Sequence, residues 1–208
     1  MAGTERDAWA GCAVVVPAGG GATRMGGADK LAADLDGASV LARAVAGVPP
    51  HVPLVVVGPQ RPLPRPALSA REDPAGGGPA AAVAAGMAAL AEAGALAGAE
   101  LVVVLAGDAP WSASAVPALV ATLRAADPAV AAAVGVDAAG HRQPLLAVHR
   151  APALLARVAS APQGLAGRSA GWLLGSGGVV EVPVSARAAT DVDTPQALEA
   201  ARRLGSPG

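Results

Sequence analysis

Residues 12–30 read CAVVVPAGGGATRMGGADK. The first five residues form a short, uninterrupted apolar run, which is typical of a strand buried on both faces in a parallel sheet. Five glycines then precede Lys30, and glycine lets the backbone come close to a ligand with its amide N–H groups directed at it. This stretch therefore predicts a buried strand that leads into an anion-binding loop suited to phosphate.

Similar valine-rich runs recur at 54–58 and 101–107, and each of them ends at a glycine. Segments long enough for helices lie between and after these runs, at 40–48, 80–96 and 113–125. The second half of the chain predicts strands at 130–136, 144–149 and 179–182 and helices at 150–159, 167–174 and 195–204. Because strand and helix alternate, we expect an α/β fold, a Rossmann-like three-layer sandwich with a mostly parallel central sheet.

The composition suits a single domain formed by residues 1–208. Hydrophobic residues make up 53% of the chain, and Ala, Val and Leu must fill the core because Phe, Tyr and Ile are absent. The net charge of -1 argues against an extensive basic surface for nucleic acid. No apolar run is long enough to span a bilayer, and the single cysteine, Cys12, excludes an intramolecular disulfide. We therefore expect a cytoplasmic protein with no nucleic-acid or membrane partner.

Lys30 is the only lysine of the chain, and the other 14 of the 15 basic residues are arginines. A lone lysine behind a glycine loop indicates that a compact ammonium group is needed there. Arg24 lies in the same loop. Backbone donors, an arginine fork and an ammonium group together suit a nucleoside triphosphate, whose negative charges are crowded.

The spacing of the glycines excludes two common phosphate loops. The P-loop requires a lysine directly after its last glycine, but Gly26 is followed by Gly27. The dinucleotide-binding loop requires a third glycine at the position of Arg24, and this mismatch also disfavours a nicotinamide oxidoreductase. The loop is therefore of another kind.

The patterns AGG at 18–20, RMG at 24–26 and DK at 29–30 together resemble the signature loop of the MobA-like nucleotidyltransferases. This family contains molybdenum cofactor guanylyltransferase. Four later blocks resemble further parts of the family and occur in its order: ED followed by GGP at 72–79, AGDAP at 106–110, QPL at 143–145 and DVDTP at 191–195. The resemblance implies a nucleotide-diphospho-sugar-transferase-like fold.

Asp108 is the first candidate for a metal ligand, because it follows the predicted strand 101–107 at the sheet edge where α/β proteins bind ligands. Mg²⁺ prefers oxygen ligands and commonly takes one or two carboxylates together with substrate phosphates. Asp191 and Asp193 are two positions apart, so both point to one side of an extended segment. Asp193 either adds a second carboxylate to the metal site or caps the helix that starts near Pro195.

Two side chains, those of Ser112 and Thr194, precede predicted helices and are expected to cap them. The three histidines, His51, His141 and His149, show no ligand spacing, so we expect them to be surface or lightly packed side chains. Ser112 and Ser114 have no histidine near them in the sequence, so a serine hydrolase is not supported.

The resemblance also implies which residues contact the nucleotide. Backbone groups of the first loop would lie near the base and ribose, while Arg24 and Lys30 would neutralise the phosphates. Asp73, after a predicted short strand at 67–71, would belong to the same pocket, and its neighbour Glu72 is expected to be solvated. The implied nucleotide-binding residues are Pro17, Ala18, Gly19, Gly20, Lys30, Asp73 and Asp108; the catalytic ones are Arg24, Lys30 and Asp108; the metal ligands are Asp108 and Asp193.

The activity implied by the resemblance is transfer of GMP from GTP to molybdopterin carrying molybdenum, with Mg²⁺ as cofactor and release of pyrophosphate. A phosphate of the pterin acceptor would attack the α-phosphorus in line, so no protein nucleophile is required. Molybdoenzyme maturation proteins would be further partners.

The donor base stays open between GTP and CTP. Gly58 stands where the guanylyltransferases tend to place Asn, and Pro17 stands where Leu is usual. Another NTP transferase of the same superfamily is therefore an alternative. A nucleotide-binding accessory protein without catalysis is the alternative from a different class.

Overall fold

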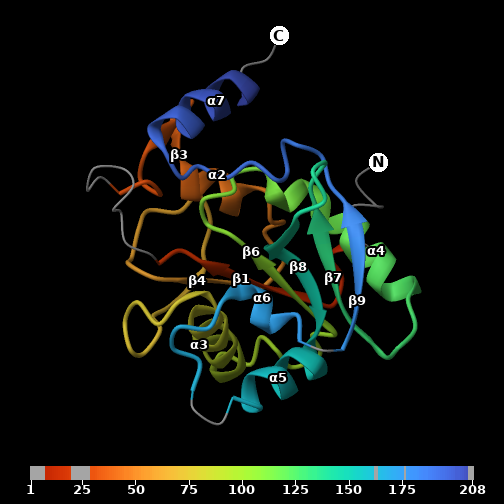
Figure 1. Ribbon diagram of the computed structural model, residues 1–208. Coiled ribbons are helices and arrows are strands. Elements are labelled where there is room, and N and C mark those ends of the chain that lie inside the picture. The colour runs from red at the N-terminus through yellow and green to blue at the C-terminus, as the bar shows by residue number, and fades with distance from the viewer. Residues whose placement is uncertain (1–7, 20–28, 162–163, 176, 206–208) are drawn as a thin grey trace.

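The structure, a computed structural model, describes residues 8–19, 29–161, 164–175 and 177–205 (Figure 1). Within these residues, seven strands form one sheet in the order β5–β4–β1–β6–β8–β7–β9. The strands are β1 (Cys12–Pro17), β4 (Leu54–Val57), β5 (Leu68–Ala70), β6 (Leu101–Leu105), β7 (Val130–Val136), β8 (Arg142–Arg150) and β9 (Gly178–Pro183). Two predicted site residues, Gly20 and Arg24, lie outside the described residues.

The direction of β8 sets it apart from the other strands of this sheet. β1 pairs in parallel with β4 and β6, β4 with β5, and β7 with β9, whereas β8 is antiparallel to both β6 and β7. The prediction of a mostly parallel sheet is therefore confirmed. Because β8 runs the other way, Arg142 at its start pairs with Val136 at the end of β7, and Leu146 in its middle pairs with Leu105 at the end of β6. The start of β8 thus lies at the edge where its neighbours end.

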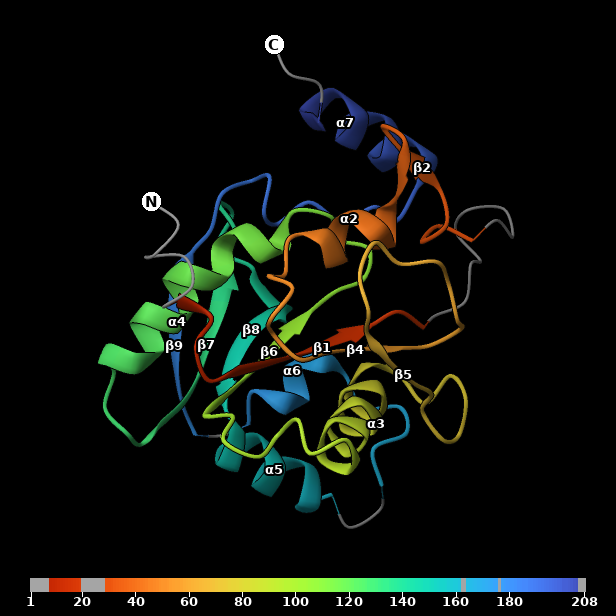
Figure 2. The same ribbon diagram turned by 180° about the vertical axis from the view of Figure 1, so that it is seen from behind.

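Helices cover both faces of the sheet (Figures 1 and 2). One face packs against α3 (Pro79–Glu92), α5 (Ala151–Ala159) and α6 (Ala170–Leu173), and the other packs against α2 (Val40–Ala46) and α4 (Val116–Ala125). Along β1, Val14 belongs to the core under α2 and α4, and Val15 belongs to the core under α3. Strands buried on both faces need apolar residues at every position, which explains the valine runs and gives the predicted three-layer sandwich.

A small second sheet helps to hold the C-terminal segment near Lys30. β2 (Asp34–Leu35) and β3 (Ala38–Ser39) pair in antiparallel fashion just before α2. Leu35 and Val40 share an apolar cluster with Val192 and with Leu198 of α7 (Pro195–Gly205). This cluster holds the 191–195 block, which is distant in sequence, close to the segment that follows Lys30.

Helix α4 begins at Val116, not at residue 113 as the sequence predicted. A 3₁₀ turn, η2 (Ser112–Ala115), precedes it, and Ser112 Oγ donates to Ala109 O at 2.9 Å and makes no cap. Pro117 explains the later start, because proline has no N–H to donate and fits the first turn of an α-helix. The prediction of a Ser112 cap was therefore wrong.

Helix α3 is shorter than the predicted 80–96 and ends at Glu92. Gly94 follows with φ +71°, a left-handed conformation that ends a helix readily. In the middle of α3, a Cβ on Gly86 would lie 2.6 Å from Val15 Cγ1, so glycine is what allows the helix to pack closely on β1. No helix in the described part of the chain has the length and apolar composition needed to cross a membrane.

His149 is buried in β8, where a surface or lightly packed position was expected. It is 2% exposed and pairs in register with Val102 of β6 and Ala132 of β7. Burial lowers its pKa to about 4, and its Nε2 has no hydrogen-bond partner. The side chain is therefore a neutral core residue at physiological pH. His51 and His141 are exposed, as predicted.

Candidate active site

The site lies where β1 and β6 end side by side. The chain adds β4 and β5 on one side of β1 and then returns as β6 on the other, so the strand order reverses between β1 and β6. Open α/β sheets bind ligands outside the carboxyl ends of strands at such a reversal. Gly107 N donates to Pro17 O at 3.0 Å, and a Cβ on Gly107 would meet that same oxygen at 3.0 Å. Glycine therefore brings Asp108 close to the end of β1.

Lys30 joins two carboxylates at this edge. Its Nζ lies 2.5 Å from Asp108 Oδ2 and 2.5 Å from Asp193 Oδ1, although these residues are 78 and 163 positions away in sequence. The Lys30 and Asp108 side chains are each 22% exposed, so water screens the contact only partly. Burial alone would lower the pKa of Lys30, but the hydrogen bonds with Asp108 and Asp193 outweigh it and raise the pKa above its ordinary value. The ammonium group therefore stays charged.

The backbone around Lys30 is fixed by its neighbour Asp29. Asp29 Oδ1 accepts a hydrogen bond from Leu31 N at 3.1 Å, and Arg61 Nε donates to Asp29 Oδ2 at 2.7 Å. Arg61 Nη1 also donates to Ala18 O at 2.9 Å, which ties this turn to the end of β1. The guanidinium group of Arg61 lowers the pKa of Asp29. The backbone of Lys30 is therefore held in a fixed turn, and its side chain extends to the carboxylates of Asp108 and Asp193.

The block at 191–195 brings Asp193 to Lys30. Val192 is fully buried, and its N–H donates to Asp108 O at 2.9 Å. Thr194 Oγ1 accepts from Ala197 N at 3.1 Å, so Thr194 caps α7 as predicted. The sequence left Asp193 either as a metal ligand or as the cap of this helix, and Thr194 is the residue that caps it. The Asp193 carboxylate faces the site instead.

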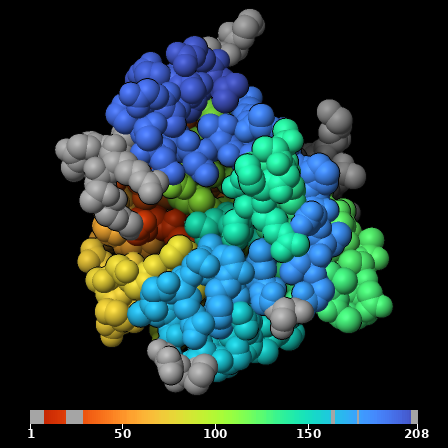
Figure 3. Space-filling view, viewed as in Figure 1, coloured from red at the N-terminus to blue at the C-terminus, as the bar shows by residue number. Residues whose placement is uncertain are grey.

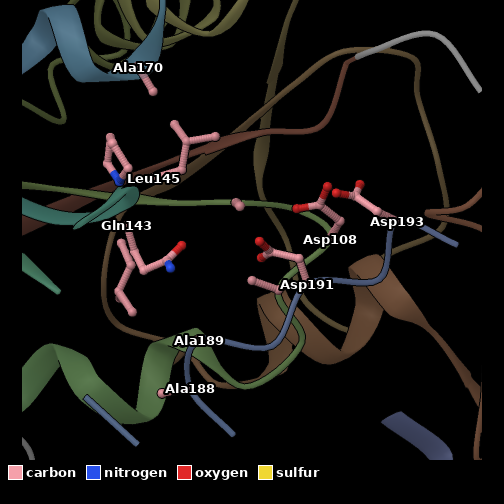
Figure 4. Close-up of a pocket in the computed structure, with 12 residues that line it drawn as sticks. Asp108, Gln143, Leu145, Ala170, Ala188, Ala189, Asp191 and Asp193 are labelled. Carbon is pink, nitrogen blue, oxygen red and sulfur yellow. The ribbon is translucent and has the colours of Figure 1, made fainter. Parts of the chain in front are cut away.

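Asp191 adds a third carboxylate to the same cavity (Figure 4). Solvent reaches the side chain, but the surrounding protein displaces much of the water from the carboxylate. This desolvation, together with the negative charges of Asp108 and Asp193 and against the opposing charge of Lys30, raises the pKa of Asp191 to about 6. Asp191 thus adds negative charge beside the two carboxylates that pair with Lys30, and the surplus negative charge favours a cation.

Two cavities meet at Asp108. One has a volume of 280 Å³ and reaches from Asp108 and Asp191 on one side to Gln143 and Ala170 on the other (Figure 4). The other, of 230 Å³, extends past Pro17 toward the start of α3. In the space-filling view, the end of β1 in red lies in a hollow between the C-terminal segment in blue and the segment around α3 in yellow (Figure 3). Ala106, Asp108 and Leu145 line both cavities, so the arrangement suits two ligands that react across Asp108.

The second cavity contains Glu72 and not Asp73. Glu72 Oε1 accepts from Gly76 N at 3.2 Å, and a Cβ on Gly19 would lie 3.0 Å from the same oxygen. The Glu72 side chain therefore lies against Gly19, although the sequence indicated a solvated side chain. Asp73 is exposed and lines a separate hollow with Arg71. The structure thus gives no support to the prediction that Asp73 contacts the nucleotide.

Several backbone groups of the first loop are engaged by the fold itself. Ala18 N donates to Val57 O at 2.7 Å, Ala18 O accepts from Arg61, and Pro17 O accepts from Gly107 N. Pro17 and Gly19 line the 230 Å³ cavity, and Ala18 is buried. Pro17 and Ala18 therefore fix the shape of the cavity more than they offer free hydrogen-bonding groups.

Gln143 owes its place at the site to the direction of β8. It lies near the start of that strand, and its Nε2 donates to Asp137 Oδ2 at 3.1 Å. Asp137 also accepts from His141 N and Ala139 N at 2.9 Å each, and these bonds, the one from His141 first, lower its pKa. The sequence prediction missed Asp137, although an Asp at the start of a DAAGH turn is a recognisable signal.

Residues 14–171 match the family that is described as the MobA-like NTP transferase domain. The chain belongs to this family. The fold and family predictions are therefore confirmed, and the protein is an NTP transferase at the level of its family. No curated protein matches the chain in sequence.

Solved structures show the same fold. Molybdopterin-guanine dinucleotide biosynthesis protein A from Archaeoglobus fulgidus is 21% identical with a TM-score of 0.64, covering 92% of this chain and 97% of that one. The 2-C-methyl-D-erythritol 4-phosphate cytidylyltransferase of Thermus thermophilus is 21% identical with a TM-score of 0.63, covering 91% and 96%. CMP:2-keto-3-deoxy-manno-octonic acid synthetase, solved with CTP, is 18% identical with a TM-score of 0.64, covering 93% and 97%. At these identities the likeness establishes the nucleotide-diphospho-sugar-transferase-like fold.

A divalent metal ion is implied by the MobA-like family, and the donor set can be tested against it. No group of three or more His, Cys, Asp or Glu side chains in the described ranges is arranged to hold a metal ion by itself. Asp108 and Asp193 nevertheless direct one oxygen each at a common cationic group, Lys30 Nζ. Two carboxylates completed by substrate phosphates are a donor set that Mg²⁺ commonly uses. The residues present therefore fit such an ion.

Proposed function

We propose that this protein transfers GMP from GTP to the phosphate of a molybdopterin acceptor and releases pyrophosphate. The observation that carries the proposal is the convergence of Lys30, Asp108 and Asp193 at the point where two cavities meet. One cavity begins at the glycine loop after β1 and suits the nucleotide. The other opens beside Gln143 and suits the acceptor.

The chemistry needs positioning and charge neutralisation, not a protein nucleophile. An oxygen of the acceptor phosphate attacks the α-phosphorus of the nucleotide, the bond from that phosphorus to the β-phosphate oxygen breaks, and pyrophosphate leaves with the electron pair. Lys30 offsets negative charge on the phosphates, and Arg24 is proposed to do the same from the glycine loop. A Mg²⁺ ion held by Asp108 and Asp193 would supply further charge neutralisation at the phosphate oxygens.

Glu72 supports guanine as the donor base. An ionised carboxylate only accepts hydrogen bonds, and Glu72 lines the cavity assigned to the nucleotide. Guanine presents two adjacent N–H donors on one edge, whereas cytosine presents a donor beside an acceptor nitrogen that a carboxylate would repel. CTP is nevertheless a second candidate, because two similar structures are a cytidylyltransferase and a synthetase solved with CTP.

A pyrophosphate-release assay with GTP, CTP, ATP and UTP, each with Mg²⁺ and molybdenum-loaded molybdopterin, tests the proposal. We expect release with GTP only, and only when the acceptor is present. Release with CTP instead would assign the cytidylyl reaction. Tight GTP binding without any release would favour the accessory protein, and no binding of any triphosphate would refute nucleotidyl transfer altogether.

A further inference from the structure

The ammonium group of Lys30 uses the carboxylate oxygens that a divalent cation would need. Its Nζ is 2.5 Å from one oxygen of Asp108 and 2.5 Å from one oxygen of Asp193. Mg²⁺ binds carboxylate oxygens at about 2.1 Å. A metal ion on the same two oxygens would therefore lie within about 4.6 Å of Nζ, the sum of those two lengths, and the two cations would repel each other strongly.

The charges of the site favour an exchange of partners. Asp108, Asp191 and Asp193 carry three negative charges against one positive charge on Lys30, which leaves two negative charges uncompensated. A divalent cation balances these charges without help from the lysine. The ammonium group then needs a new anion, and the phosphates of a nucleotide in the adjoining cavity supply one.

We propose that Lys30 competes with the divalent cation for Asp108 and Asp193, and that the cation transfers the ammonium group from these carboxylates to the phosphates of the nucleotide. The competition concerns only the carboxylates and the cation. The transfer to phosphate rests on the proposed function. In this scheme, the lysine keeps the carboxylates from taking up a metal ion before a nucleotide is present.

The exchange requires only a side-chain movement. The turn that carries Lys30 is held by the ion pair of Asp29 with Arg61, by Leu31 packed in the core, and by Ala33 N, which donates to Lys30 O at 3.3 Å. The four methylene groups of the lysine have alternative staggered rotamers. The backbone can therefore stay in place while Nζ moves from one anion to another.

Titration of the full-length protein with Mn²⁺ in the absence of nucleotide, followed by electron paramagnetic resonance, tests the competition. Lys30→Gln removes the competing cation and keeps a polar side chain of similar length, so we expect it to bind Mn²⁺ about tenfold more tightly than the wild type. Arg142→Gln is the matched control, because it removes one positive charge from an exposed pair with Glu181 and leaves the turn that carries Lys30 in place. We expect it to leave Mn²⁺ affinity within about twofold.

The single lysine gives a second and independent readout. Reductive methylation with ¹³C-formaldehyde labels only Lys30 and the terminal amine, and the terminal amine serves as the internal reference. We expect methylation of Lys30 to be slow in the wild type and to accelerate severalfold with saturating Mg²⁺. In an Asp108→Asn, Asp193→Asn double variant, the lysine should react quickly and should not respond to Mg²⁺.

The outcomes separate the competition from the catalytic proposal, because neither readout depends on turnover. Equal tightening of Mn²⁺ binding in Lys30→Gln and Arg142→Gln would show a general charge effect and would overturn the competition. Unchanged lysine reactivity with bound Mg²⁺, or no Mn²⁺ binding by Lys30→Gln, would overturn it as well. Competition without pyrophosphate release from any triphosphate would refute the proposed function alone.

Discussion

The shape of the ammonium group explains why a lysine stands at position 30 in a chain that otherwise uses arginine. A lysine presents a compact charge with three donors, whereas arginine presents a broad planar fork. The single nitrogen of Lys30 lies 2.5 Å from both Asp108 and Asp193, in the space that suits a metal ion. The identity of this residue therefore matters beyond its charge.

Lys30→Arg tests this point while keeping the charge. We expect kcat/KM for pyrophosphate release to fall about a hundredfold, because the guanidinium group cannot fit between the two carboxylates without moving them. The reverse change, Arg142→Lys, replaces a cation in an exposed pair with Glu181 and should alter kcat/KM less than about twofold. Full activity of Lys30→Arg would show that only the charge is used.

Two adjacent acids give a second prediction at the scale of the residue. Glu72→Gln should raise the KM for GTP about tenfold with a smaller change in kcat, because it removes a charged acceptor from the nucleotide cavity. Asp73→Asn changes an exposed carboxylate outside that cavity and should leave KM nearly constant. Steady-state kinetics of both variants measures the difference, and the opposite pattern would restore the family-based assignment of Asp73.

At the scale of the element, helix α3 depends on the absence of a side chain at Gly86. Gly86→Ala should destabilise the protein by about 1–3 kcal/mol, because the new Cβ would lie 2.6 Å from Val15 Cγ1. Helix propensity alone favours alanine by about 1 kcal/mol, so it predicts the opposite sign. Ala88→Gly, at an exposed position of the same helix, isolates that propensity and should cost about 1 kcal/mol. Urea unfolding of both variants decides whether packing or propensity controls α3.

At the scale of the whole molecule, the sequence predicted the sheet and the meeting point of the candidate site at Asp108 and Lys30. The buried strands follow from the valine runs, and Asp108 follows from its place after β6, because both are local signals. The choice of Glu72 over Asp73 could not be predicted, since it depends on how the chain turns against Gly19. The pairing of Arg61 with Asp29 is equally invisible in the sequence, because it joins residues 32 positions apart.

The stability of the whole fold should depend on His149 under mildly acidic conditions. Its folded pKa is about 4, below the ordinary value of 6.5, so the unfolded chain binds an extra proton between these values. The contribution is therefore fully present above pH 6.5 and is lost as the pH falls toward 4, by about 3 kcal/mol in total. Nε2 has no partner to lose, so His149→Leu should keep the neutral-pH stability and show a shallower decline in acid.

Chemical unfolding of the wild type and His149→Leu at half-unit intervals from pH 4 to 7.5 measures this difference. Protonation of carboxylates also destabilises the fold in acid, but both proteins contain the same carboxylates. Their contribution is therefore removed when the two proteins are compared. His51→Leu removes one exposed histidine and controls for the loss of an ionisable group as such. If all three proteins lost stability in parallel, the buried imidazole would not be the group that links folding of this sheet to pH.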